Sequence, residues 1–92
     1  MKMVFAVFDI KAEAYLQPFF LDTTGQALRS IYDCIKDPNH QFGAHPEDYT
    51  LYYVGLYDQS TCEFTELQKT IVHTFLEIKA SYERQQQEAL VP

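Results

Sequence analysis

Basic residues are scarce in this chain of 92 residues. Seven Lys and Arg stand against thirteen Asp and Glu, which gives a formal net charge of -6. Proteins that hold nucleic acid mainly through its phosphates usually show the opposite balance. No Lys or Arg lies between Lys36 and Lys69, whereas six Asp and Glu residues lie in this interval. A nucleic acid, if one binds, should avoid this part of the chain.

Glycine and cysteine are also rare. Three glycines are too few for a phosphate-binding loop of the usual kind. Cys34 and Cys62 lack metal-site spacing, so we expect two reduced thiols. His40 and His45 lie among acidic residues but match no strong metal pattern, so we expect no metal and no cofactor. Since no serine elbow or recognisable Cys/His pair occurs either, the sequence predicts a protein that is not an enzyme.

Long hydrophobic runs are absent. The apolar start, MKMVFAVFDI, is too short to span a membrane, and no small-residue cleavage site follows it. We therefore expect no membrane association and a location in the cytoplasm of the cell that makes the protein.

Apolar and aromatic residues are abundant, at 47% and 15% of the chain. This composition is typical of a globular fold, and the length allows one domain. We predict a single α+β domain over residues 1–80 and a frayed tail over residues 81–92.

The hydrophobic pattern predicts strands at residues 3–9, 50–57 and 62–67. A capping box at Thr23 and Gln26 starts a helix that runs to about Lys36, with Ala27 or Leu28, Ile31, Tyr32 and Ile35 as its apolar stripe. A second helix is expected from about Lys69 to Glu88, although Thr70-Ile71-Val72 could instead extend a strand. Residues 10–22 and 38–49 are expected to be loops.

The predicted order is β-α-β-β-α. A right-handed crossover would make the first two strands parallel, and the third would lie between them. The expected fold is a small two-layer sandwich: a three-stranded, truncated ferredoxin-like sheet with helices on one face.

The aromatic residues allow two interpretations. Surface rings can stack unpaired bases, as sheet aromatics do in single-strand binders. Alternatively, they can fill the core and cover a dimer face. The sequence favours this second interpretation, because the basic residues that usually accompany base stacking are sparse. If DNA binds, the candidate contact residues combine basic side chains with loop aromatics: Lys11, Tyr15, Phe20, Arg29 and Lys36.

The second predicted strand is apolar on both faces. Leu51, Tyr53 and Tyr57 are expected on one face, and Tyr52, Val54 and Leu56 on the other. An apolar patch of this size usually marks an interface, and a twofold dimer is its commonest solution. We therefore predict a homodimer with Tyr52, Tyr53, Val54 and Tyr57 in its interface. The rival is that residues 10–22 and the C-terminal helix cover that face.

Three stretches follow one another over roughly residues 4–64: FAVFDIKAEAYLQPFF, TTGQALRSIYDCIKDPNHQF and HPEDYTLYYVGLYDQSTCEF. They resemble the small non-structural protein of the gokushoviruses, single-stranded DNA phages of the Microviridae. The match rests on their order and spacing, and it is poorer in the C-terminal third.

The resemblance implies a non-virion protein of an infected bacterium, in a family commonly described as DNA-binding. It implies a role in single-stranded genome synthesis or packaging, with single-stranded DNA and phage or host replication and packaging proteins as partners. The alternative is a protein-interaction module that binds a phage or host protein without contacting DNA.

Overall fold

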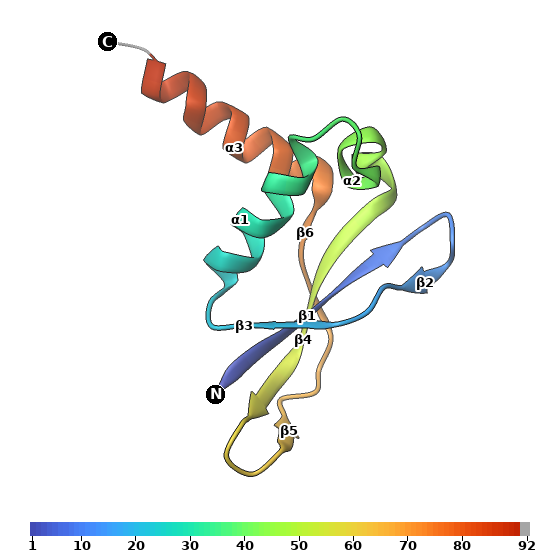
Figure 1. Cartoon of the computed structure of the whole chain (residues 1–92), viewed down its shortest axis with the longest axis vertical. Helices are drawn as coiled ribbons and strands as arrows, with labels where there is room; N and C mark the ends of the chain where they lie inside the picture. Colours follow the sequence, from blue (N-terminus) through green and yellow to red (C-terminus); the bar gives the residue numbers. More distant parts are fainter. Residues whose placement is uncertain (91–92) are drawn as a thin grey trace.

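The computed structural model describes residues 1–90, with side chains through Gln86. One antiparallel sheet carries a layer of helices (Figure 1). The strands are β1 (Lys2–Asp9), β2 (Ala14–Tyr15), β3 (Phe19–Leu21), β4 (Tyr49–Asp58), β5 (Glu63–Thr65) and β6 (Thr70–Thr74). The helices are α1 (Thr24–Ile35), α2 (Gln41–Ala44), the 3-10 turn η1 (Pro46–Asp48) and α3 (Phe75–Leu90).

The expected three-stranded, partly parallel sheet is wrong. The long strands β1 and β4 pair directly and antiparallel at the centre. The strands β2 and β3 flank β1, while β5 and β6 flank β4. The domain is nevertheless α+β.

The segment after β1 explains the antiparallel pairing. The Asp9 carboxylate accepts hydrogen bonds from the Lys11 and Ala12 backbone N–H groups, at 3.0 and 3.3 Å, and so stabilises a turn. The chain then runs back along β1, and the expected loop at residues 10–22 contains the two short strands β2 and β3. Strand β3 returns the chain to the end of the sheet where β1 begins. Helix α1 then carries the chain back to the other end, so β4 starts beside Asp9 and runs antiparallel to β1 (Figure 1).

Helix α1 confirms the prediction from the capping residue and the apolar period. The Thr23 hydroxyl accepts the Gln26 N–H at 3.1 Å. The Gln26 side chain accepts from the Asp22 N–H rather than reaching Thr23, so only half of the predicted box forms. The predicted stripe is buried: Ala27, Ile31, Tyr32 and Ile35.

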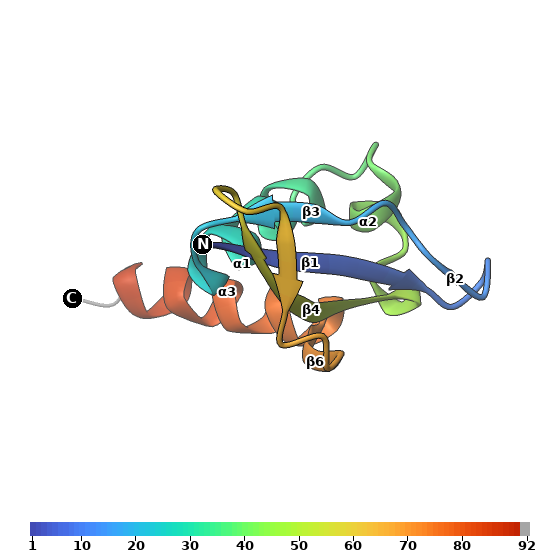
Figure 2. The ribbon, with the colours of Figure 1, turned by 90° about the horizontal axis from the view of Figure 1, so that it is seen from below.

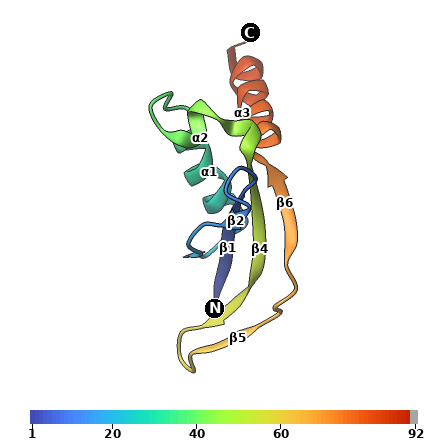
Figure 3. The same cartoon turned by 90° about the vertical axis from the view of Figure 1, so that its right-hand side faces the viewer.

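The core lies between the sheet and the helices, which gather on one side of β1 and β4 (Figure 3). Phe5, Leu51, Phe75 and Ile78 are its most deeply buried large side chains. They come from β1, β4 and α3, so the C-terminal helix is part of the core.

The C-terminal helix begins later than expected, because residues 70–74 form β6. Its start is a capping box at Thr74 and Glu77. The Thr74 hydroxyl accepts the Glu77 N–H at 3.1 Å, and the Glu77 carboxylate accepts the Thr74 N–H at 2.7 Å. These hydrogen bonds lower the pKa of Glu77 below its ordinary value. Helix α3 continues to Leu90. The end of the predicted frayed tail, residues 91–92, lies outside the described residues.

The expected loop at residues 38–49 contains α2 and η1. Gly43 lies against the end of α1, where an added Cβ would come within 2.0 Å of the Asp37 carbonyl oxygen and 2.7 Å of the Ile35 carbonyl oxygen. Only glycine permits this approach without a backbone shift. Over residues 1–90, no helix has the length and apolar character needed to cross a membrane.

Candidate nucleic-acid interface

The sheet has a second face, which the helices do not cover. Residues that pair across antiparallel strands point to the same side, so the register assigns its members. We call this surface the open face. Its strand positions are Lys2, Val4, Ala6, Phe8, Tyr15, Phe20, Thr50, Tyr52, Gly55, Tyr57, Phe64, Ile71 and Thr74. None of these positions is Asp or Glu.

Aromatic rings cover the middle of the open face. Val4 and Ala6 are buried, yet they do not belong to the core beneath the helices. Phe20 is the β3 partner of Val4, and Tyr52 is the β4 partner of Ala6. The rings therefore shield a small apolar layer and remain partly exposed themselves.

One group of rings, which we call the lysine platform, lies near the β1–β2 turn. The Tyr15 ring meets those of Phe8 and Tyr52 edge to face, at centroid distances of 4.8 and 5.3 Å. The Lys69 ammonium lies 4.4 Å from the Tyr15 centroid and 5.4 Å from that of Tyr52. Both distances suit a cation–π interaction, so a positive charge is held over exposed aromatic surface.

A second group of rings surrounds a hollow beside the β4–β5 turn. Phe20, Tyr57 and Phe64 come from β3, β4 and β5, with centroids 4.9 to 6.3 Å apart. Together with Lys2, Gln59 and Cys62 they line a space of about 470 Å³. We call it the turn hollow. Its lining residues come from the start of β1, from β3, from the end of β4, from the β4–β5 turn and from β5, elements that lie toward one end of the sheet (Figure 1).

Two lysines lie at the open face. Lys69 lies over the lysine platform, and Lys2 lines the turn hollow. The one carboxylate that binds either lysine within the described chain is that of Asp22, whose Oδ1 lies 2.6 Å from Lys2 Nζ. A tyrosine hydroxyl is uncharged at neutral pH, and a side-chain hydrogen bond with Cys62 raises the pKa of Tyr57 further above its ordinary value.

The segment between β5 and β6 passes over β4, the strand with which both of them pair (Figure 2). It passes close to Gly55, where an added Cβ would lie 2.8 Å from the Thr65 carbonyl oxygen and 3.0 Å from Leu67 Cδ2. Gly55 thus allows the crossing that carries Lys69 to Tyr15. Sequence reasoning missed Lys69, because it placed that residue at the start of a helix.

Comparison with known proteins gives one match. A family model described as phage ORF5 protein covers residues 2–78. The chain belongs to the phage ORF5 protein family. No curated protein and no solved structure matches it. The resemblance is thereby confirmed at the level of a bacteriophage protein.

The predicted DNA-contact residues of this phage ORF5 protein are not all brought together. Tyr15 and Phe20 lie on the open face. Arg29 lines a hollow with Phe20 and Lys2, whereas Lys11 and Lys36 each line other hollows. Lys36 lies over the Tyr32 ring of α1 and 3.4 Å from Asp33. The rings Phe8 and Phe64 were missed, although each pairs with a tyrosine that the sequence analysis selected.

The predicted dimer residues fall on different surfaces. A bulge at Val54 places Phe5 opposite Tyr53 but Val4 opposite Gly55. Tyr57 therefore shares the open face with Tyr52, and the predicted side assignment is wrong. Tyr53 faces the helices, packs against the core and donates a hydrogen bond to Glu66 at 3.1 Å.

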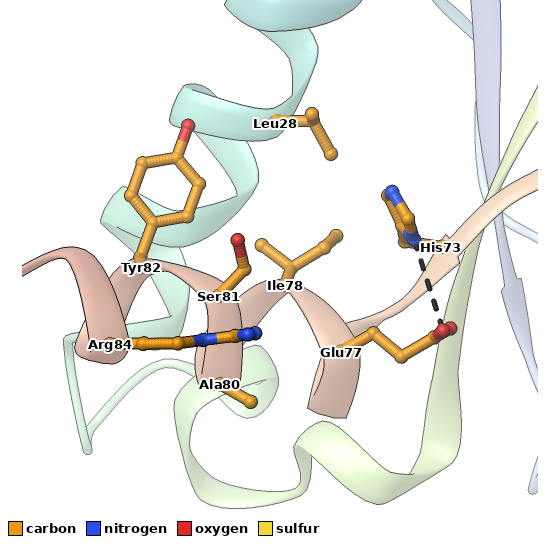
Figure 4. Close-up of a pocket in the computed structure, with 8 residues that line it drawn as sticks. All are labelled: Leu28, His73, Glu77, Ile78, Ala80, Ser81, Tyr82 and Arg84. Atoms are coloured by element: carbon orange, nitrogen blue, oxygen red, sulfur yellow. Dashed lines mark ion pairs between the residues drawn. The ribbon is translucent and has the colours of Figure 1, made fainter.

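A further hollow of about 340 Å³ lies between α1 and α3 (Figure 4). Leu28, Ile78 and Tyr82 form its apolar part, and His73 lies 3.9 Å from Glu77 at one end. Ser81 makes no hydrogen bond to His73 within the described chain, so the group lacks the nucleophile–base pair of a hydrolase. The absence of enzymatic activity stays a prediction.

Three side chains near η1 could share a metal ion. The ligand atoms of His45, Glu47 and Asp48 lie within 4.8 Å of one another. His45 and Glu47 are exposed, as solvated charges usually are. His40 is not part of this group, because its Nδ1 accepts the Phe42 N–H and caps α2. The expectation of no metal stays a prediction.

Proposed function

We propose that the protein is a non-enzymatic accessory protein of a gokushovirus that binds single-stranded DNA weakly during genome replication or packaging. The phage ORF5 family supports a phage protein, and the resemblance over residues 4–64 supports the narrower lineage. On this proposal the protein acts in the host bacterial cytoplasm and is not part of the virion. Its other partners are phage or host replication and packaging proteins.

The composition of the open face carries the proposal. Exposed rings lie there beside two lysines, while no strand position of that face bears a carboxylate. This contrasts with the net charge of -6. Aromatic side chains on a sheet stack unpaired bases whatever their sequence, and nearby cations hold the backbone. The open face has both components.

The affinity should be modest and only mildly dependent on salt. Each phosphate neutralised on a single strand contributes roughly 0.7 to the slope of log affinity against log salt. Lys69 makes no ion pair with any residue whose side chain is described, while Lys2 is shared with Asp22. The expected slope therefore lies between about -0.7 and -1.4, and stacking supplies most of the affinity.

The second candidate function is a protein-interaction module that binds a phage or host protein without contacting DNA, on a surface that also suits a second copy of the chain. Exposed apolar residues favour it: Phe64 is 48% exposed, Ile71 62% and Leu67 66%. Phe20 of the 10–22 segment packs against Phe64, with ring centroids 6.3 Å apart, yet all three residues remain exposed. On this proposal the homodimer interface is the open face around Tyr52 and Tyr57. DNA and a second copy would then compete for one surface.

Fluorescence anisotropy with a labelled single-stranded oligonucleotide tests the proposal. Tyr52→Ala should weaken binding by about 1–3 kcal/mol, the usual value of one stacked base. Leu76→Ala is the matched control, because Leu76 is an exposed apolar residue of α3. An absence of binding at low salt would refute DNA binding and leave the interaction module. Equal losses in both variants would refute the open face as the site.

A further inference from the structure

The turn hollow differs from the lysine platform in shape. At the platform, Lys69 lies over two rings. At the turn hollow, three rings form the walls of a space of about 470 Å³. The hollow is open to solvent on one side, so a flat group can lie against its rings without entering an enclosed cavity. The two groups of rings therefore offer different kinds of contact to a strand.

The walls of the turn hollow are exposed aromatic surfaces. Phe20 and Phe64 are 44% and 48% exposed, although they are large apolar side chains. The Tyr57 ring lies between them in the sheet, 5.3 Å from Phe20 and 4.9 Å from Phe64. A planar base that entered the hollow would cover these rings and gain stacking energy from them.

The polar residues at the hollow match the remaining parts of a nucleotide. Lys2 offers an ammonium for a phosphate. The Gln59 side chain offers both a donor and an acceptor, which suits the polar edge of a base. Gln59 belongs to the β4–β5 turn, and Lys2 lies on β1 opposite Tyr57. The two polar groups thus come from separate elements around the aromatic walls.

We infer that the turn hollow holds one unpaired base of a single strand, with the neighbouring phosphate on Lys2 and the base edge on Gln59. This inference rests on the proposed single-stranded DNA binding and adds a defined base site to it. The Asp22 carboxylate competes with the phosphate for Lys2, and this competition is one reason that the affinity for DNA should be modest.

Cys62 provides a direct probe, because it is exposed and lines the hollow. The chain has two cysteines, so Cys34→Ser leaves Cys62 as the single thiol. A saturating oligonucleotide should slow iodoacetamide alkylation of Cys62 several-fold. Anisotropy on the same samples reports whether the oligonucleotide is bound. Bound oligonucleotide with an unchanged alkylation rate would overturn the base site and leave DNA binding intact. No binding at low salt would overturn both.

Two substitutions test the aromatic wall and the lysine separately. Phe64→Ala should weaken oligonucleotide binding roughly 5- to 150-fold and abolish protection of Cys62, with Leu76→Ala as the control. Asp22→Asn should tighten binding and steepen the salt slope by about 0.7, because it frees Lys2 for a phosphate. An unchanged slope would remove Lys2 from the site. Unchanged affinity in Phe64→Ala would refute stacking in the hollow.

Gln59→Ala tests the contact to the base edge. The variant should keep most of its affinity, since the rings and Lys2 remain, but its affinities for oligo-dA, oligo-dC and oligo-dT should converge. A ranking of the three oligonucleotides identical to that of the wild type would exclude Gln59 from base recognition.

Discussion

Lys69 offers the sharpest test of how the open face binds DNA. Its ammonium lies over the Tyr15 and Tyr52 rings, where a phosphate next to a stacked base would reach it. Lys69→Gln removes that charge and keeps much of the aliphatic chain. Lys36→Gln is a matched control, because Lys36 is also exposed and also lies over a tyrosine ring, 5.5 Å from the Tyr32 centroid.

The expected change follows from counterion release. Losing one phosphate contact should make the slope of log affinity against log salt shallower by about 0.7. Between 50 and 200 mM salt, a fourfold increase, the wild type should lose roughly 2.6 times more affinity than Lys69→Gln. Lys36→Gln should keep the wild-type slope. Oligonucleotide titrations at four salt concentrations measure all three slopes.

Two outcomes would refute this reasoning. Equal changes in both variants would mean that DNA senses only the overall charge of the protein. An unchanged slope in Lys69→Gln would mean that no phosphate reaches the lysine platform. In either case the rings of the open face would need another partner, and the dimer becomes the better explanation of their exposure.

The remaining predictions concern stability and assembly. Thr23→Ala should cost about 1 kcal/mol through the lost cap of α1, and an unchanged thermal melt would contradict that. Gly43→Ala should cost roughly 1–3 kcal/mol through overpacking, because its Cβ would collide with the Asp37 carbonyl; Gly25→Ala, with no neighbour closer than 3.8 Å, should raise the melting temperature instead. The lowered pKa of Glu77 means that its capping contribution is complete above the ordinary value of 4.5 and is lost as the pH falls through the lowered value. The melting temperature of Glu77→Gln should therefore approach that of the wild type in acid, and a constant gap would contradict the cap. Without DNA, the open face is available to a second copy, so light scattering at micromolar concentration should give twice 10.8 kDa; a mass near 10.8 kDa would refute the dimer.

Patterns within a short stretch of sequence predicted helices α1 and α3, because capping and one-sided burial depend on residues close together in the chain. Helix α1 was predicted from Thr23 and from apolar residues three and four apart, because capping and one-sided burial leave a periodic trace in the sequence. The start of α3 carried the same kind of signal. Thr74 and Glu77 have the spacing of a capping box, but the apolar residues before them suggested an earlier start.

Non-local pairing decided the sheet. Residues 10–22 carry no clear period, and they become strands only because β1 offers an unpaired edge. Whether two strands pair parallel or antiparallel depends on where the chain re-enters the sheet. Here the point of re-entry is set by residues 10–22, which bring the chain back to the start of β1. The residues of β1 and β4 themselves do not specify it.

The sequence alone determined that the protein is small, acidic, rich in aromatic residues and similar to a phage family. Only the tertiary structure decided which rings share a surface. The bulge at Val54 shifts the alternation of β4 by one residue and brings Tyr57 to the face of Tyr52. The crossing beside Gly55 brings Lys69 to Tyr15, 54 positions away in the chain. Both depend on close approach between distant segments, and period-two patterns within one strand do not record such contacts.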